Sequence, residues 1–167
     1  AQLGAAKWGY VRGSRMAGTA NVEPKRVLEA MPSATVFLSV PTLYVRLLAE
    51  ARRNRNVTRN IGRFVAGSAP LLIETFTAWQ QRTGHTILER YGMSETIMLT
   101  SNPYAPALGE RRGGTVGLPL PGVRLRIQDD AGRPLAMGGT GALQGQGPNV
   151  FKAYWRGPER TQNKVPL

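Results

Sequence analysis

The stretch Arg63-Phe-Val-Ala-Gly-Ser-Ala-Pro70 decides the fold of this chain, because it is a short, largely apolar run that ends in glycine, serine and proline. A run of this length bounded by turn residues is typical of a buried strand. After it, Leu72, Phe76 and Trp79 fall near one face of a helix predicted over residues 71–82. The sequence therefore predicts a strand that leads directly into an amphipathic helix.

The same alternation of strand and helix extends to both sides of this stretch. Upstream, Thr35-Val-Phe-Leu-Ser-Val-Pro41 is mostly β-branched and apolar, which fits a strand buried on both faces, and residues 43–48 follow with apolar residues at helical spacing. A short helix is predicted over residues 23–31 and a third strand over residues 86–91. This alternation predicts an α/β fold, in which a partial parallel β-sheet is flanked by helices and joined by right-handed crossovers.

The pattern changes after residue 104. Residues 113–122 are dense in glycine and proline, Val123-Arg-Leu-Arg-Ile127 alternates with a period of two, and Asp129-Asp-Ala-Gly132 is typical of a tight turn. These features predict a small antiparallel β-rich piece beside the first layer. We therefore divide the chain into three parts: residues 1–22, which stay unassigned, a partial α/β nucleotide-binding subdomain over 23–104, and a partial β-rich subdomain over 105–167.

Composition excludes several classes of protein. Hydrophobic residues make up 41% of the 167 residues and charged residues 19%, which is ordinary for a globular domain. The chain has no cysteine, so it has neither a disulfide framework nor a thiolate metal site. No apolar run is long enough to span a bilayer, and the first residues lack a signal pattern. We expect a soluble protein of the cytoplasm, or of the mitochondrial matrix if the source is eukaryotic.

The net charge of +12 raises the question of a nucleic-acid partner. The densest basic stretch holds Arg52, Arg53, Arg55, Arg59 and Arg63, and no aromatic residues interleave with it for base stacking. We interpret it as a solvated helix end and loop, and expect no specific nucleic-acid partner. A basic nucleic-acid-binding module stays open as an alternative.

Ligands of parallel α/β sheets bind beyond the carboxyl ends of the strands, so the three strand exits are the candidate site. The exits comprise residues 40–42, 67–70 and 91–95, and each is rich in small, hydroxyl-bearing or turn-forming residues. Glycine allows close approach of backbone to a ligand, serine and threonine supply hydroxyl groups, and Glu95 supplies a carboxylate suited to Mg²⁺.

Four ordered motifs carry a resemblance to a known family. They read Gly67-Ser-Ala-Pro-Leu71, Glu89-Arg-Tyr-Gly-Met-Ser-Glu95, Gly117-Leu-Pro-Leu-Pro-Gly122 and Gly147-Pro-Asn-Val-Phe-Lys-Ala-Tyr-Trp155. In this order and spacing they resemble the adenylate-forming superfamily of acyl-CoA synthetases, peptide-synthetase adenylation domains and luciferases. The stretches at residues 41–48 and 100–104 are most similar to malonyl-CoA synthetases, and the resemblance covers about two thirds of the chain.

The resemblance implies a two-step ligase reaction. A carboxylate, here malonate or a similar short dicarboxylate, attacks the α-phosphate of ATP and gives an acyl-adenylate and pyrophosphate. The thiol of coenzyme A then displaces AMP. ATP, Mg²⁺ and coenzyme A are therefore the expected cosubstrates and cofactors, and these small molecules are the expected partners. The sequence predicts no oligomeric state.

The resemblance also implies roles for individual residues. Tyr91 would pack against the adenine ring, Ser94 stands where the family usually has threonine and keeps the hydroxyl, and Glu95 would bind Mg²⁺; Ser94 and Glu95 are the candidate catalytic residues. Arg90, with Arg46 as a second candidate, would meet the distal carboxylate of the acid, and Met93 would border the acyl pocket. The candidate nucleotide-binding residues are Gly67, Ser68, Ala69, Pro70, Glu89, Tyr91 and Gly92.

The chain also departs from the family pattern. We do not find the upstream phosphate loop, the ribose-binding aspartate or the small C-terminal domain with its catalytic lysine, and Ala142 stands where the family usually has glutamate. We therefore expect a truncated chain that has no synthetase activity alone and whose open sheet edges aggregate or pair with another chain. A non-catalytic nucleotide-binding remnant is the second alternative.

Overall fold

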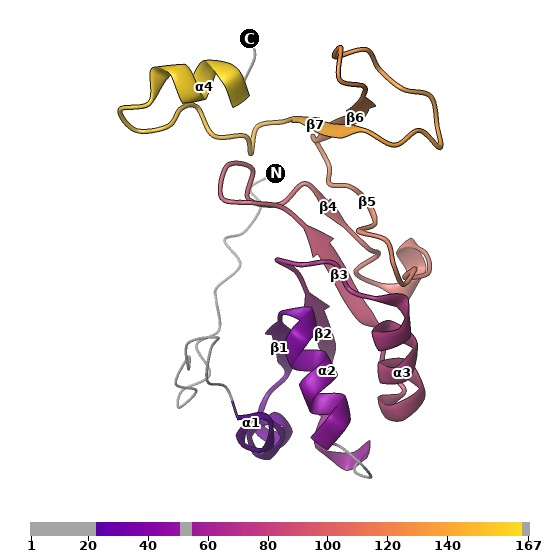
Figure 1. Ribbon diagram of the computed structural model, residues 1–167. Helices are drawn as coiled ribbons and strands as arrows, with labels where there is room; N and C mark the ends of the chain where they lie inside the picture. Colours follow the sequence, from indigo (N-terminus) through magenta and orange to yellow (C-terminus); the bar gives the residue numbers. More distant parts are fainter. Residues whose placement is uncertain (1–22, 51–54, 165–167) are drawn as a thin grey trace.

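The computed structural model describes residues 23–50 and 55–164 of the chain (Figure 1). The segment 1–22, which the sequence leaves unassigned, lies outside the described residues, as do Arg52 and Arg53 of the basic stretch. Within the described ranges, no helix combines the length and apolar character needed to cross a membrane.

A five-stranded sheet in the order β1-β2-β3-β4-β5 forms the centre of the molecule. The first three strands are parallel, as predicted, with Phe64 opposite both Phe37 and Ile87. The last two strands pair antiparallel. The bounds are β1 Val36–Ser39, β2 Arg63–Ala66, β3 Ile87–Tyr91, β4 Thr100–Ser101 and β5 Leu118–Pro119.

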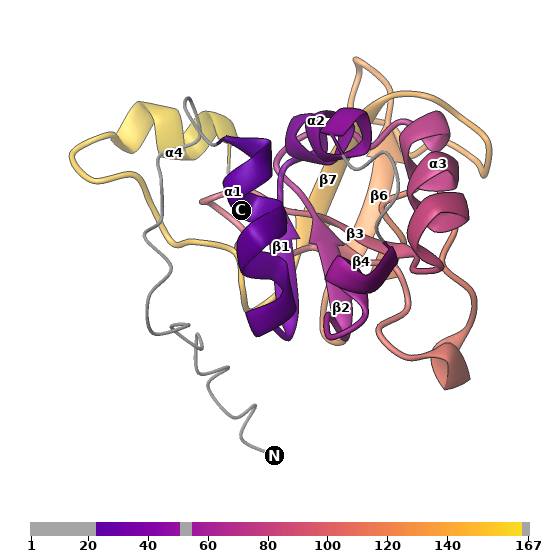
Figure 2. The same ribbon diagram turned by 90° about the horizontal axis from the view of Figure 1, so that it is seen from below.

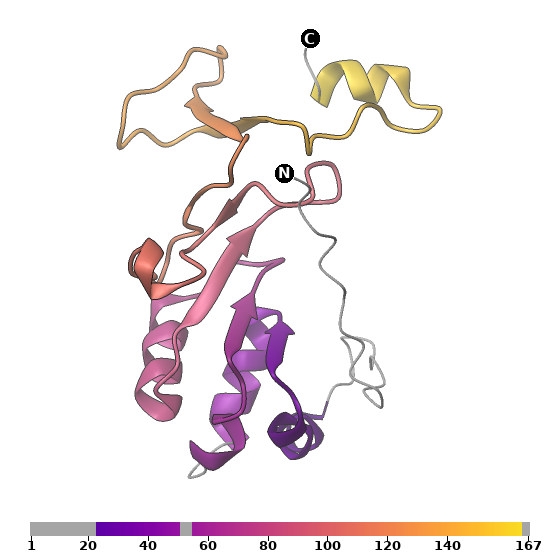
Figure 3. The ribbon, with the colours of Figure 1, turned by 180° about the vertical axis from the view of Figure 1, so that it is seen from behind.

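Three α-helices cover one face of the parallel strands (Figure 2), and the opposite face carries no helix of the described chain at these strands (Figure 3). The helices confirm the predicted alternation with the strands. They are α1 Pro24–Ala30, α2 Pro41–Glu50 and α3 Ile73–Thr83, and short 3₁₀ turns occur at Met31–Ser33, Arg55–Thr58 and Pro106–Leu108.

Aromatic side chains form the core between the sheet and the helices. The Trp79 ring meets Tyr44 edge-on at 4.9 Å and Phe64 at 5.1 Å between ring centroids. All three side chains are at most 1% exposed. The Tyr44 hydroxyl donates a hydrogen bond of 2.9 Å to the Val65 carbonyl, so α2 is tied to the middle strand by a polar contact inside an apolar core.

The prediction that the first strand is buried on both faces is wrong. Val36 is 54% exposed and Leu38 is 60% exposed, whereas Phe37 between them packs against Tyr44 on the helix side. The physical reason is that β1 is the edge strand and its second face has no covering layer in the described chain.

The strands β4 and β5 were not predicted, because each has only two residues. Gly117 shows how closely they approach, since its φ is +80° and a Cβ there would lie 2.1 Å from the Ser101 carbonyl carbon. The buried Asn102 side chain next to β4 fastens the intervening loop, donating to the Thr115 carbonyl and accepting from the Arg112 amide. The division of the chain at residue 104 stays a prediction, although β5 joins the first sheet.

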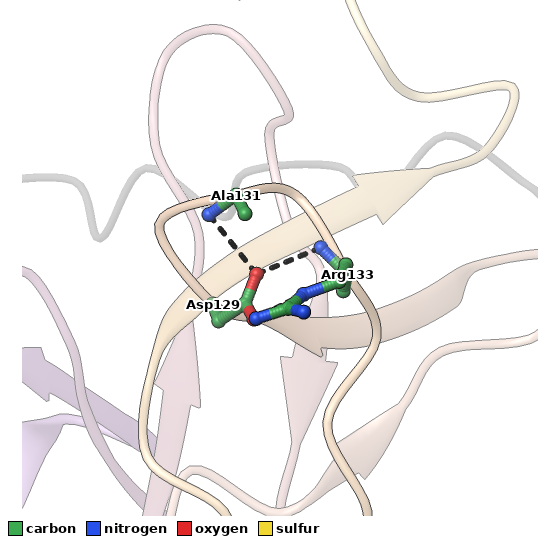
Figure 4. Close-up of polar contacts among 3 residues, drawn as sticks. All are labelled: Asp129, Ala131 and Arg133. Atoms are coloured by element: carbon green, nitrogen blue, oxygen red, sulfur yellow. Dashed lines mark hydrogen bonds and ion pairs between the residues drawn. The ribbon is translucent and has the colours of Figure 1, made fainter.

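The predicted antiparallel piece is a two-stranded sheet of β6 Arg124–Gln128 and β7 Ala142–Gln146. The tight turn after β6 is confirmed, since the Asp129 carboxylate accepts hydrogen bonds from the backbone amides of Ala131 and Arg133 and pairs with the Arg133 guanidinium (Figure 4). These bonds, led by the one from the Arg133 amide, hold the pKa of Asp129 below its usual value. The last helix, α4, spans Pro158–Lys164.

The Tyr44 hydroxyl gives a first test of this packing. Tyr44→Phe leaves the ring in place and removes the hydrogen bond from its hydroxyl to the Val65 carbonyl. The free energy of unfolding should therefore fall by about 1 to 2 kcal/mol. Chemical denaturation measures it. Tyr104→Phe, at a 54% exposed ring, is the matched control and should change stability by less than about 0.5 kcal/mol. Equal effects of the two variants would contradict this description of the core.

Candidate functional site

The exits of β2 and β3 lie side by side at one end of the parallel strands. The backbone amide of Leu71, which follows the exit of β2, donates a hydrogen bond of 2.9 Å to Glu89 Oε1 on β3. At Gly67 a Cβ would lie 3.6 Å from the Arg90 carbonyl oxygen, so the two backbones are in close contact. Residues 67–70 therefore pass directly beside the end of β3, and Ser68 makes this turn with a φ of +68°.

Glu89 is a buried carboxylate, and one of its two oxygens accepts no hydrogen bond from the described residues. The residue is 4% exposed, and burial raises its pKa above the ordinary value, while the hydrogen bond from Leu71 offsets part of that rise. Its second oxygen, Oε2, is buried and accepts no hydrogen bond within the described part of the chain. A buried acceptor without a donor is costly, and it is chemically matched to a ligand that brings an N–H group.

The loop after β3 is held in a tight shape. Leu99 donates its amide to the Tyr91 carbonyl at 2.9 Å, which closes the loop. Gly92 is required inside it, because a Cβ there would lie 2.1 Å from the Ile97 carbonyl oxygen. Met93 is 44% exposed and Ser94 is also exposed, so both side chains are open to a ligand that approaches this loop.

Glu95 lies in the same loop and contacts a distant part of the chain. Its Oε1 accepts a hydrogen bond of 2.8 Å from the Tyr154 hydroxyl, and its backbone carbonyl accepts one of 2.7 Å from the Phe151 amide. The bond from Tyr154, then the residue's own backbone amide, and the charge of Arg160 together hold the pKa of Glu95 below its ordinary value against the effect of burial. The carboxylate is therefore ionised at neutral pH.

The segment between β7 and α4 fastens this loop from above in the view of Figure 1, and Figure 3 shows the same contact from behind. Its Asn149 side-chain amide donates to two carbonyls of the loop, those of Thr96 at 2.6 Å and Met98 at 2.9 Å. Together with Phe151 and Tyr154, Asn149 makes the segment after β7 part of the candidate site.

Arginines gather on the face of the sheet away from the helices. Strand alternation places Arg90 there, since its neighbour Glu89 meets Leu71 on the helix side. Arg63 and Arg111 lie close enough that their charges act on one another: burial first, then the charges of Arg63 and Arg90, lower the pKa of Arg111. The Arg90 Nε is buried and has no partner among the described residues. Arg46 lies on α2, exposed and on the other side of the sheet, so the structure does not bring it to Arg90.

The described residues contain no group of three or more histidine, cysteine, aspartate or glutamate side chains that could hold a metal ion. Glu95 offers one ionised carboxylate at the strand exits, so a hard cation there would need further oxygen ligands from a bound phosphate or from water. The chemistry of this donor fits Mg²⁺, which commonly binds through one or two carboxylates plus substrate phosphates.

A pocket of about 310 Å³ lies at the opposite, amino ends of β2 and β3. Its lining includes Arg63, His85 and Arg111. The Arg111 guanidinium donates hydrogen bonds to the backbone carbonyls of Pro103, Thr86 and Tyr104, so this side chain cross-links the structure. This pocket is remote from the strand exits and holds none of the predicted site residues.

The structure brings together most of the residues singled out in the sequence. The exits of β2 and β3 gather Gly67, Ser68, Ala69, Pro70, Glu89, Arg90, Tyr91, Gly92, Met93, Ser94 and Glu95. Sequence reasoning missed Tyr154 and Asn149 as site residues. The only signal was their position in the Gly147–Trp155 motif, since contacts between residues more than 50 positions apart leave no local pattern.

Comparison with known proteins gives consistent matches. The AMP-binding enzyme family matches residues 8–155. A malonate–CoA ligase from Arabidopsis thaliana is 39% identical over 138 residues, which is 78% of this chain and 22% of that protein. The ATP-bound crystal structure of MatB from Rhodopseudomonas palustris is 47% identical with a TM-score of 0.79, covering 86% of this chain and 28% of that one.

A malonyl-CoA ligase in a ternary product complex with methylmalonyl-CoA and AMP bound is 33% identical, with a TM-score of 0.72 over 86% of this chain and 31% of that one. The chain thus spans between a fifth and a third of the length of these three proteins.

The amide of Asn149 tests whether the segment after β7 holds the loop. Asn149→Ala removes both donors to the loop, so the amides of residues 96–99 should exchange with solvent about 10-fold faster, as hydrogen exchange followed by NMR will measure. Gln146→Ala, at an exposed side chain of β7, is the control. Unchanged exchange in Asn149→Ala would show that the loop keeps its shape without this contact.

Proposed function

Because the chain belongs to the AMP-binding enzyme family, we propose that the whole protein is an ATP-dependent acid–thiol ligase that joins malonate, or a similar short dicarboxylate, to coenzyme A. The observation that carries this proposal is the junction of the β2 and β3 exits, where a buried acceptor, an aromatic ring and an ionised carboxylate follow one another at residues 89, 91 and 95. The names of the Arabidopsis relative and of the malonyl-CoA ligase structure support malonate and related acids.

The nucleotide would lie against residues 67–70 and Tyr91. The unpartnered Oε2 of Glu89 supports this placement, because the exocyclic amino group of adenine is the hydrogen-bond donor that such an acceptor lacks. Small residues at the β2 exit let backbone approach the base, and the Tyr91 ring offers it an apolar face. Gly92 would keep the following loop close to the same strand.

Adenylation must bring two anions together, a carboxylate and a triphosphate. A nucleophilic carboxylate oxygen forms a bond to the α-phosphorus while the bond from that phosphorus to the departing pyrophosphate breaks. When bound, Mg²⁺ neutralises part of the phosphate charge. Glu95 would be its protein ligand, and the exposed Ser94 hydroxyl would donate a hydrogen bond to a phosphate oxygen.

The acid would approach from the face that carries Arg90. Its buried Nε, which has no partner among the described residues, makes this face favourable for an anion, which supports a substrate with a second, distal carboxylate. Met93 would border the chain of the acid. Arg46 lies on the other side of the sheet, so of the two arginines only Arg90 is placed to be the carboxylate partner.

Coenzyme A would take the acyl group from the adenylate in the second step and release AMP. The expected absence of a specific nucleic-acid partner stays a prediction, as does a location in the cytoplasm or the mitochondrial matrix. The second candidate is a non-catalytic nucleotide-binding protein, which would keep the β2 and β3 exits and bind AMP without forming an adenylate.

Glu89 tests the nucleotide site. Glu89→Gln keeps an oxygen for the Leu71 amide and replaces the spare acceptor with an N–H donor, which opposes the amino group of adenine. The dissociation constant for AMP, measured by calorimetry, should rise about 10-fold. Asp130→Asn, in the exposed turn after β6, is the matched control. Equal AMP affinity in wild type and Glu89→Gln would place the base elsewhere.

Substitution of Arg90 tests whether this residue binds the distal carboxylate of the acid. In ATP–pyrophosphate exchange by the whole protein, Arg90→Gln should lower kcat/KM for malonate about 100-fold and leave kcat/KM for butyrate, which has no second carboxylate, within a few fold. Arg124→Gln, at an exposed arginine of β6, is the control. AMP binding without any exchange in the wild type would favour the non-catalytic alternative, and an equal loss for both acids would contradict the role of Arg90.

A further inference from the structure

We propose that Tyr154 is a positioning residue that fixes the Glu95 carboxylate for adenylation. The inference rests on the proposed function, because it assigns to a second residue the task of orienting a group with a role in that reaction. Tyr154 lies 59 positions from Glu95 in the sequence, in the segment between β7 and α4.

The contact between the two side chains is direct. The Tyr154 hydroxyl donates a hydrogen bond of 2.8 Å to Glu95 Oε1, and no other side chain within the described residues bonds this carboxylate. A glutamate has three side-chain torsions and reaches solvent in many rotamers, so a strong donor from a distant part of the chain restricts which of them it adopts. Removal of the hydroxyl therefore frees the orientation of the carboxylate without removing its charge.

Tyr154 is itself held from several sides. Its ring meets the Phe151 ring edge-on, with 4.6 Å between the ring centroids. The guanidinium of Arg160, a residue of α4, lies 5.0 Å from the centroid of the Tyr154 ring. The Tyr154 backbone amide donates to Thr161 Oγ1 at 3.0 Å, and that hydroxyl donates to the Gly157 carbonyl at 2.8 Å. The contacts with Phe151, Arg160 and Thr161 thus set the position of the ring whose hydroxyl reaches Glu95.

The backbone beside Glu95 is fixed by the same segment. The amide of Phe151 donates to the Glu95 carbonyl at 2.7 Å, three residues before the tyrosine. The backbone and the side chain of Glu95 are therefore both hydrogen-bonded to residues 151–154. The first bond fixes the position of the Glu95 backbone, and the second fixes the orientation of its carboxylate. This double attachment distinguishes Tyr154 from a residue that merely packs against the loop.

The chemical consequence follows from the two oxygens of a carboxylate. Tyr154 occupies Oε1 and leaves Oε2 without a side-chain partner among the described residues, so the hydroxyl decides which oxygen is offered to a cation or a phosphate-bound water. A tyrosine hydroxyl keeps its proton at neutral pH and acts as a donor throughout the working range. A carboxylate that is already oriented loses less conformational entropy when it binds a cation than a mobile one does. We therefore expect the Tyr154 hydroxyl to raise the rate of the chemical step.

The first experiment compares Tyr154→Phe, Glu95→Gln and the double variant in the whole protein by ATP–pyrophosphate exchange with malonate. Tyr154→Phe keeps the ring contacts with Phe151 and Arg160 and should lower kcat about 10-fold with less than a twofold change in KM for malonate. In the Glu95→Gln background the same change should have no further effect, because the hydroxyl acts through the carboxylate. Tyr104→Phe, which removes a hydroxyl outside the site, should leave kcat unchanged.

A second readout does not depend on turnover. Binding of Mn²⁺ in the presence of AMP, followed by water-proton relaxation, should weaken about 10-fold in Tyr154→Phe and by more in Glu95→Gln. Glu95→Asp provides an independent variant that leaves the tyrosine intact, because the shorter side chain withdraws the carboxylate from the hydroxyl and should reproduce the loss in kcat. Melting temperatures of all variants verify that the compared proteins are folded.

The outcomes separate this inference from the proposed function. If Glu95→Gln strongly lowers exchange while Tyr154→Phe and Glu95→Asp retain wild-type kcat and Mn²⁺ binding, the positioning role is wrong and the proposed function stands. Additive losses in the double variant also overturn it, since Tyr154 would then act independently of Glu95. If Glu95→Gln retains full exchange, the assigned role of Glu95 fails, and the role of Tyr154 fails with it.

Discussion

The hydrogen bond from the Leu71 amide to Glu89 joins the ends of two parallel strands, and the arrangement of the candidate site depends on it. The chain must leave β2, cross residues 67–70 and enter α3 while Leu71 is buried, so its amide needs an acceptor inside the protein. A carboxylate on the neighbouring strand supplies one oxygen for this purpose, while the other is buried and has no hydrogen-bond partner among the described residues. One side chain thus shapes the β2 exit, and under the proposed function its second oxygen would accept a donor from the nucleotide.

The parallel layer and its exits could be predicted because their signals are local. Apolar runs such as residues 63–66, each followed by turn residues, define β1, β2 and β3 and place their carboxyl ends at one edge, and an amphipathic helix follows each of the first two. The burial of the first strand was mispredicted, because a run such as residues 36–39 reads the same in a central strand as at an edge. The two-residue strands β4 and β5 are too short to produce any period.

The part of the site that sequence reasoning could not supply comes from residues distant along the chain. Tyr154 and Asn149 reach the loop after β3 across more than 50 positions, and neither hydrogen bond follows from periodicity or turn chemistry. The loop that carries Glu95 is therefore shaped by the first sheet on one side and by the segment before α4 on the other.

We expect the exits of β2 and β3 to form one wall of a nucleotide site, and a crystal structure of the whole protein with AMP tests this claim most directly. We predict that the adenine ring stacks on Tyr91 beside residues 67–70, with its amino group within hydrogen-bond distance of Glu89 Oε2. AMP bound instead at the amino ends of the strands, beside Arg63 and His85, would contradict the account.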